Sequence, residues 1–164
     1  MSNAEINCKF KELLTQLHKE LFKPRGYSKS NQDFLSYSKG NLGKYINFQK
    51  SRFNSKDIFR FTVNVEVFLV NEEPPKHKYD RQFVFGERIG YFSNNYNCDQ
   101  WWCFNSDNYD DIYNELKSVF LNDIFPILDK LECKKDLVIL YKSGKFDWRF
   151  WSQQFEKEIK LLEN

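Results

Sequence analysis

Residues 44–70 read KYINFQKSRFNSKDIFRFTVNVEVFLV, and this stretch decides the fold. Two runs that alternate between apolar and polar side chains flank a polar segment, residues 54–57. Alternation with a period of two is typical of strands that bury one face, and a polar turn between two such runs predicts a β-hairpin. The apolar face of the second run carries Phe59, Phe61, Val63, Val65, Val67 and Leu69.

The alternation also predicts how the two strands pair. When Phe48 lies opposite Val63 and Ile46 opposite Val65, apolar side chains meet across the strands. A shift of the pairing by one residue would expose the apolar side chains to water. The pattern therefore strongly specifies which side of each strand faces the core. The same register sets polar residues opposite one another: Asn47 with Asn64, Gln49 with Thr62, Ser51 with Arg60, and Tyr45 with Glu66.

The polar face of this hairpin is made mostly of amides and hydroxyls, which both donate and accept hydrogen bonds. One interpretation is an ordinary solvated face of a sheet that helices cover on its other side. The other is a hydrogen-bonding surface for a polar ligand or partner. The sequence leaves both open.

Upstream of the hairpin, an apolar stripe at helical spacing predicts a helix that ends before Pro24. A first strand follows at residues 33–39 and a turn at residues 40–43. The stripe consists of Ile6, Phe10, Leu13, Leu14, Leu17 and Leu21.

Downstream, residues 71–82 contain Pro74 and Pro75 and predict a loop. Residues 83–92 predict a strand, in which Gly86 indicates a bulge. Residues 100–105 predict another, and its neighbouring Trp101 and Trp102 must then point to opposite faces.

The last third of the chain predicts helices. Ser106-Asp107 suits an N-cap for a helix whose stripe is Ile112, Leu116, Val119, Phe120 and Ile124. Pro126 ends that helix, kinks it or opens a new one. Residues 137–141 favour a short helix, with an edge strand as the alternative. Asp147 suits the cap of a final helix that buries Trp148, Trp151, Phe155, Ile159 and Leu162.

Strands in one block followed by helices in another predict the α+β class. We expect an N-terminal helix, an antiparallel sheet of about five strands, and two or three C-terminal helices packed on one sheet face. The length of 164 residues predicts a single domain over residues 1–164.

Composition excludes several classes of protein. A net charge of +2 is too small to indicate a polyanion partner, and the apolar runs are too short to span a membrane. With no secretory signal and four scattered cysteines, the sequence predicts a cytoplasmic protein. No phosphate loop, nucleophile elbow or zinc spacing occurs, so we expect no cofactor and no metal site.

Several motifs occur in an order that resembles the bacterial domain-of-unknown-function family 4304. The resemblance covers about residues 10–130, and the family usually has a glycine where this chain has Val65 and Glu66. The family implies no established activity; by analogy, some small bacterial families of this kind act as immunity proteins. The motifs are Pro24-x-Gly26-Tyr27, Phe34, Asn47-Phe48-Gln49-Lys50-Ser51, Asn64, Arg88-Ile89-Gly90 and Trp101-Trp102.

Three functional hypotheses follow. The first is a non-enzymatic binding module of immunity type, whose partner is another protein or a small polar ligand. The second is an enzyme in which Arg88 tunes Glu66 as a general base. The third, less favoured because the aromatics Phe48, Phe59 and Phe61 face the core, is a binder of single-stranded nucleic acid. The candidate binding residues are Asn47, Gln49, Ser51, Arg60, Asn64, Glu66, Arg88, Trp101 and Trp102.

Overall fold

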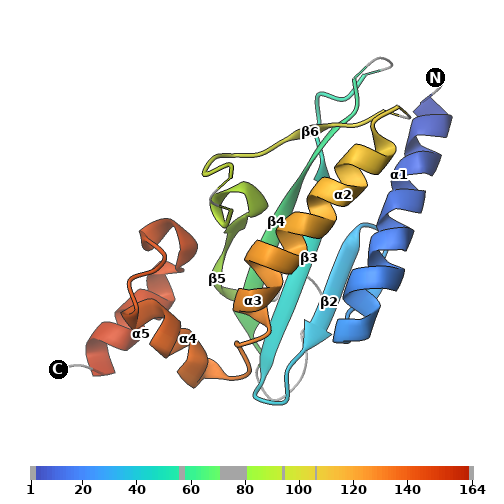
Figure 1. Ribbon diagram of the computed structural model, residues 1–164. Coiled ribbons are helices and arrows are strands. Elements are labelled where there is room, and N and C mark those ends of the chain that lie inside the picture. Colours follow the sequence, from blue (N-terminus) through green and yellow to red (C-terminus); the bar gives the residue numbers. More distant parts are fainter. Residues whose placement is uncertain (1–2, 56–57, 71–80, 94, 106, 163–164) are drawn as a thin grey trace.

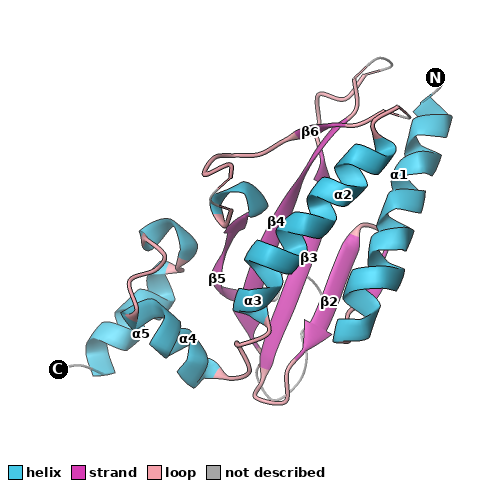
Figure 2. Ribbon diagram, viewed as in Figure 1, coloured by secondary structure: helices cyan, strands magenta, loops and turns pink. Residues whose placement is uncertain are grey.

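The computed structural model describes residues 3–55, 58–70, 81–93, 95–105 and 107–162. Its centre is an antiparallel sheet in the order β1-β2-β3-β4-β5, and β6 pairs with the beginning of β4 (Figure 2). The sequence predicted about five strands, and the α+β class is confirmed. The strands are β1 (Ser28–Ser30), β2 (Asp33–Tyr37), β3 (Leu42–Lys50), β4 (Arg60–Leu69), β5 (Gln82–Arg88) and β6 (Trp102–Cys103).

The central hairpin is formed by β3 and β4 in the register that the sequence predicted. Phe48 pairs with Val63, Asn47 with Asn64, and Ser51 donates its N–H to the Arg60 carbonyl oxygen. The residues at 56–57, predicted to form part of the turn, lie outside the described residues, as does most of the predicted loop at 71–82.

Helices α1, α2 and α3 cover one face of the sheet (Figure 1). After α1 (Asn3–Leu17), the helix continues as a π-turn over His18–Phe22 and ends at a 3-10 turn that contains Pro24. After α2 (Tyr109–Val119), a π-turn over Phe120–Ile124 leads into α3 (Phe125–Leu128). Pro126 opens α3 in its first turn, where its missing N–H costs no helical hydrogen bond.

Aromatic side chains fill the space between the sheet and these helices. Phe22 is fully buried at the centre, with ring centroids 4.4 Å from Phe34 and 4.9 Å from Phe120. Ile46, Phe48 and the alternate valines of β4 have no exposed surface on this side. Burial of this apolar face stabilises the sheet and fixes which side of the hairpin remains for other contacts.

The C-terminal helices pack beside β5. They are α4 (Lys134–Lys142), a 3-10 turn at Trp148–Phe150, and α5 (Gln153–Leu162). Trp151 forms a β-bridge with Phe85, and Ser152 donates its N–H to the Val84 carbonyl oxygen. Residues 137–141 lie within α4, so they form the helix that the sequence favoured over an edge strand.

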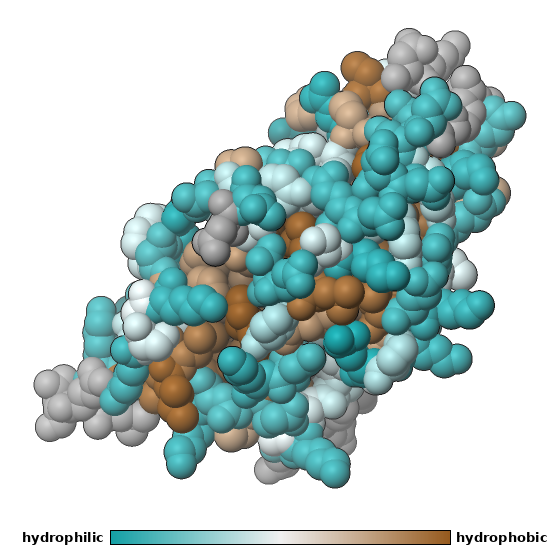
Figure 3. Space-filling view, in the orientation of Figure 1, coloured by the Kyte–Doolittle hydropathy of each residue, from teal (hydrophilic) through white to brown (hydrophobic). Residues whose placement is uncertain are grey.

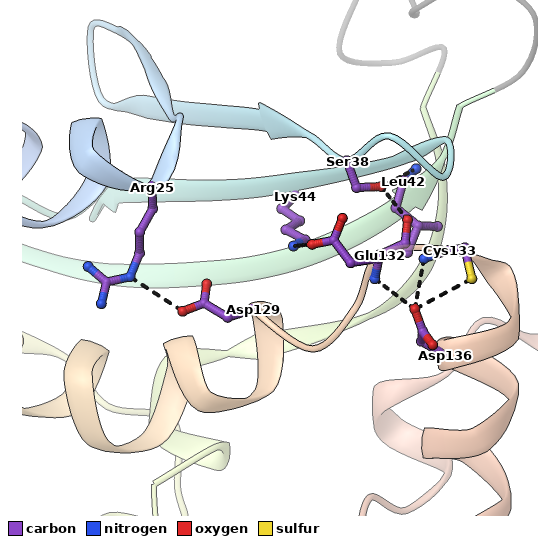
Figure 4. Close-up of polar contacts among 8 residues, drawn as sticks. All are labelled: Arg25, Ser38, Leu42, Lys44, Asp129, Glu132, Cys133 and Asp136. Atoms are coloured by element: carbon purple, nitrogen blue, oxygen red, sulfur yellow. Dashed lines mark hydrogen bonds and ion pairs between the residues drawn. The ribbon is translucent and has the colours of Figure 1, made fainter.

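The segment between α3 and α4 is tied to the sheet by polar contacts (Figure 4). Ser38 donates its hydroxyl to the Glu132 carbonyl oxygen at 2.5 Å, and Lys44 Nζ lies 3.5 Å from the Glu132 carboxylate. The Asp136 carboxylate accepts the backbone N–H groups of Glu132 and Cys133, which caps α4. These contacts set the direction in which α4 leaves the helical layer.

Three strand predictions need correction. The bulge predicted at Gly86 lies instead at Val84, which is the extra residue because Phe85 pairs with Val67 and Phe83 with Phe68. The predicted strand 83–92 ends at Arg88 and continues as a 3-10 turn. Of the predicted strand 100–105, only β6 forms. This segment pairs with β4 only at Arg60 and Phe61.

Two helix predictions also need correction. Helix α2 begins at Tyr109 with Asn108 at the N-cap position, one residue after the predicted Asp107, and Ser106 lies outside the described residues. Asp147 caps the 3-10 turn by accepting the Arg149 N–H, and Trp148 is 75% exposed. The final helix cannot run through Trp151, whose extended backbone forms the bridge to Phe85.

The helical side of the molecule is mainly hydrophilic, with apolar patches over the α3 region and toward α4 and α5 (Figure 3). Ile139 of α4 and Leu161 of α5 are among the exposed apolar side chains. Over the described ranges, every helix is too short or too polar to cross a bilayer.

Candidate functional site

The face of the sheet opposite the helices carries the predicted polar residues. We call it the open face, and we define it by Asp33, Tyr45, Asn47, Gln49, Thr62, Asn64, Glu66 and Arg88. Alternation along β3 and β4 places these side chains there, because their neighbours in sequence are the buried apolar residues. Asn47, Asn64, Glu66 and Arg88 are half-buried, and Gln49 is exposed.

A chain of hydrogen bonds crosses three strands on this face. The Asp33 carboxylate accepts from the Tyr45 hydroxyl and from Asn47 Nδ2, both at 2.6 Å. Asn64 Nδ2 then donates to Asn47 Oδ1 at 3.2 Å and to Gln49 Oε1 at 3.0 Å. The predicted amides are therefore in direct contact and hold one another in fixed orientations.

Glu66 lies in the same face, across from Gly86 of β5. Gly86 has a φ of 155°, and a Cβ there would lie 2.3 Å from the Val65 carbonyl oxygen and 3.2 Å from Glu66 Cγ. Burial raises the pKa of the Glu66 carboxyl to about 7, although the nearby Arg81 guanidinium acts in the opposite direction. Because Gly86 has no side chain, there is room beside it for the Glu66 side chain, whose carboxyl group is partly shielded from water.

Arg88 takes a different partner from the one expected. The sequence suggested Glu66, but the Arg88 side chain pairs with Asp99, and the neighbouring Glu87 accepts only the Arg88 backbone N–H. The Arg88 guanidinium also lies 5.1 Å from the centroid of Trp101. Within the described part of the chain, Glu66 and Arg88 therefore do not form the ion pair that the enzyme hypothesis requires.

The two tryptophans divide between the faces, as the sequence required. Trp101 is half-buried beside Arg88, whereas Trp102 is 3% exposed and stacks on Phe61 with centroids 5.5 Å apart. Trp102 is thus a core residue and not a surface candidate. The Thr62 hydroxyl donates to the Gln100 carbonyl oxygen at 2.7 Å and ties this segment to the sheet.

Ser51 and Arg60 lie where the hairpin leaves the sheet. Asn54 closes this end, because its side chain accepts the Arg60 N–H at 2.7 Å and donates to the Arg60 carbonyl oxygen at 3.0 Å. The Arg60 side chain is exposed. A pocket of about 520 Å³ opens here, lined by Gln49, Lys50, Ser51, Arg52, Phe53, Arg60, Arg88 and Trp101.

A second pocket, of about 320 Å³, lies between β5 and the C-terminal turn. Its lining includes Asn64, Glu66, Gly86, Arg149 and Trp151. Both pockets border the open face, so this side of the sheet is hollowed beside Gln49 and beside Glu66. No cluster of three metal-ligating side chains occurs among the residues for which the structure gives positions.

Sequence reasoning missed three residues in or beside the open face. Asp33 anchors the amide row, Asp99 pairs with Arg88, and the Arg81 guanidinium lies 4.3 Å from the Tyr45 ring centroid. Only Asp33 had a usable signal: pairing Phe34 with Ile46 sets Asp33 opposite Asn47. Arg81 and Asp99 follow irregular segments, whose paths the alternation pattern does not predict.

Comparison with known proteins gives one match. The family described as Domain of unknown function (DUF4304) matches residues 18–130, which include β1 to β6, α2 and α3. No curated protein and no solved structure matches the chain.

Proposed function

The chain belongs to the DUF4304 family, and we propose that it is a non-enzymatic binding module that contacts a polar partner through the open face. The partner is another protein or a small polar ligand. In its finer form, the proposal is an immunity-type protein of the bacterial cytoplasm. That finer form rests on analogy alone.

The observation that carries the proposal is the amide row on the open face. Asp33, Asn47, Asn64 and Gln49 form one hydrogen-bonded row across β2, β3 and β4. A surface whose polar groups are already fixed loses little side-chain entropy when a partner binds.

Glu66 supports the same conclusion. A carboxyl group whose pKa is raised by burial makes the folded state less stable at neutral pH than a neutral side chain would. Groups that are kept at a cost to stability are typical of functional sites. Glu66 lies next to the amide row, so the group that lowers stability is located where we propose that the partner binds.

The proposal is tested by comparing what two asparagine variants retain from cells of the source organism. Asn64→Ala removes both donors at the centre of the row, whereas Asn122→Ala changes an exposed asparagine on the helical side whose side chain donates to the Ser118 hydroxyl. Quantitative mass spectrometry of tagged proteins should show partners retained by wild type and Asn122→Ala and lost from Asn64→Ala. An identical set of partners on all three proteins would contradict the proposal.

A second candidate is an enzyme that uses Glu66 as a general base. It is favoured by the pKa of about 7 and by the adjoining pocket of about 320 Å³. Under this alternative, a panel of ester, amide and phosphoester substrates should reveal turnover that Glu66→Gln abolishes. Turnover that survives in Glu66→Gln would remove this candidate.

A further inference from the structure

We propose that the partner is acidic and that its carboxylates dock in the pocket at the end of the hairpin. We call this the arginine pocket; it is the pocket of about 520 Å³ that Gln49, Arg52, Arg60, Arg88 and Trp101 help to line. The inference rests on the proposed function, since it names the chemistry of the partner that the open face contacts.

The amide row ends at this pocket with a hydrogen-bond donor, the NH₂ group of Gln49. Because an ionised carboxylate only accepts, Asp33 obliges Asn47 to present Nδ2 to it and Oδ1 to Asn64. Asn64 therefore donates with Nδ2, and its other hydrogen reaches Gln49 Oε1. This leaves the Gln49 NH₂ group, a pure donor, as the end of the row at the arginine pocket.

The charged groups of the pocket are donors as well. Arg52, Arg60 and Arg88 all line it, and guanidinium groups have no acceptor atom. Asp99 pairs with Arg88, but no ion pair to a carboxylate is found for Arg52 or Arg60 among the residues with described positions. Lys50 also lines the pocket, but its ammonium group is held elsewhere, because it donates to Asn7 and lies 5.3 Å from the Phe10 ring centroid.

A concave site whose arginines and terminal amide are donors, and which carries an excess of positive charge, is complementary to anionic acceptors. Arginine forks match carboxylates in two parallel hydrogen bonds, and such charge-assisted bonds are among the strongest in proteins. Phe53 is 77% exposed at the mouth and lies under the Arg52 guanidinium, with 4.9 Å between Cζ and the ring centroid. Arginine and aromatic side chains together are the residue types that dominate protein–protein binding energy.

The geometry favours an acidic protein segment over nucleic acid. Tyr45 and Phe68 on the open face are buried, and Arg81 lies 4.3 Å and 5.3 Å from their ring centroids. They cannot act as a row of platforms for stacked bases. The net charge of +2 also provides no long basic track beyond the pocket.

The test is fluorescence anisotropy with a labelled peptide of four Glu-Ala repeats at low ionic strength. The Gln-Ala analogue and an oligothymidylate of equal length serve as the other two arms. Wild-type protein should bind the glutamate peptide in a saturable, salt-dependent way and should bind the glutamine peptide at least about tenfold more weakly. Equal binding of the two peptides would overturn the inference.

Two variants locate the binding in the pocket. Arg60→Gln removes an exposed charge, and Gln49→Glu keeps the acceptor for Asn64 while replacing the outward donor by a carboxylate oxygen. Each should raise the Kd for the glutamate peptide about tenfold, whereas Lys157→Gln and Gln153→Glu, exposed positions on α5, should change it less than about twofold. If circular dichroism shows that Arg60→Gln is unfolded, the near-isosteric Gln49→Glu decides. Equal effects of pocket and control variants would overturn the inference.

The outcomes also separate this inference from the proposed function. If the oligothymidylate binds more tightly than the glutamate peptide and Trp101→Ala abolishes that binding, the carboxylate partner is wrong. If Asn64→Ala loses cellular partners but Gln49→Glu and Arg60→Gln retain them, the open face binds and the acidic partner is again wrong. If Asn64→Ala loses nothing, the proposed function itself fails.

Discussion

Replacing Glu66 with glutamine should stabilise the protein at neutral and alkaline pH. The Glu66 pKa is raised from its ordinary value of 4.5 to about 7, because burial disfavours the charged form. The folded protein therefore holds a proton that the unfolded chain releases between about pH 4.5 and pH 7. The contribution of Glu66 to the stability of the wild type must fall as the pH rises through this window, since at this group the unfolded state binds fewer protons there.

A pKa shift of this size corresponds to about 3 kcal/mol of unfolding free energy, at about 1.4 kcal/mol for each pH unit. Glu66→Gln cannot titrate and keeps nearly the same shape. It should therefore exceed the wild type by up to about 3 kcal/mol at pH 8 and match it closely at pH 4. All other groups titrate in both proteins and cancel in the difference.

Urea unfolding at pH values between 4 and 8, followed by circular dichroism, measures this difference directly. Glu12→Gln is the matched control, because Glu12 is an exposed carboxylate whose pKa is lowered by its hydrogen bond with Lys9. Its difference from wild type should not grow in favour of the variant as the pH rises. A Glu66→Gln difference that stays constant from pH 4 to pH 8 would refute the reasoning about burial.

The remaining predictions concern the frame of the site. Gly86→Ala should lower the free energy of unfolding by more than about 1 kcal/mol, because the φ of 155° and the nearby Val65 carbonyl oxygen leave no room for a Cβ. Urea unfolding that matches the wild type would contradict this prediction, since it would show that β5 can shift to make room. Phe22→Ala should cost about 3–5 kcal/mol, because the ring is fully buried among other aromatics. Trp148→Ala, at a position that is 75% exposed, should change stability by less than about 0.5 kcal/mol, and a loss as large as that of Phe22→Ala would contradict the assigned burial.

The hairpin could be predicted in detail because its information is local. Alternation fixed the facing of β3 and β4, and apolar pairs such as Phe48 with Val63 fixed the register. The polar row followed from the same step, since Asn47 and Asn64 must share the other face. The opposite faces of Trp101 and Trp102 followed too, although only the contact of Trp102 with Phe61 identifies the buried one.

The errors arose where contacts between distant segments decide the local structure. Helical spacing extended the last helix through Trp148 and Trp151, but the bridge to Phe85 holds Trp151 in an extended conformation. Arg88 was matched with Glu66 of the neighbouring strand, whereas its partner Asp99 comes from an irregular segment. Turn paths are set by tertiary packing, and a single sequence carries little information about them.

The most direct measurement of the central claim is the NMR response of side-chain NH₂ groups to the labelled glutamate peptide. Resonances of Gln49 and Asn64 should shift as the peptide is added, because one group lines the arginine pocket and the other orients it. Those of Asn122 and Gln153, exposed on helices away from the pocket, should remain in place. Shifts confined to the helical residues, with Gln49 and Asn64 unchanged, would contradict the assignment of the open face as the binding surface.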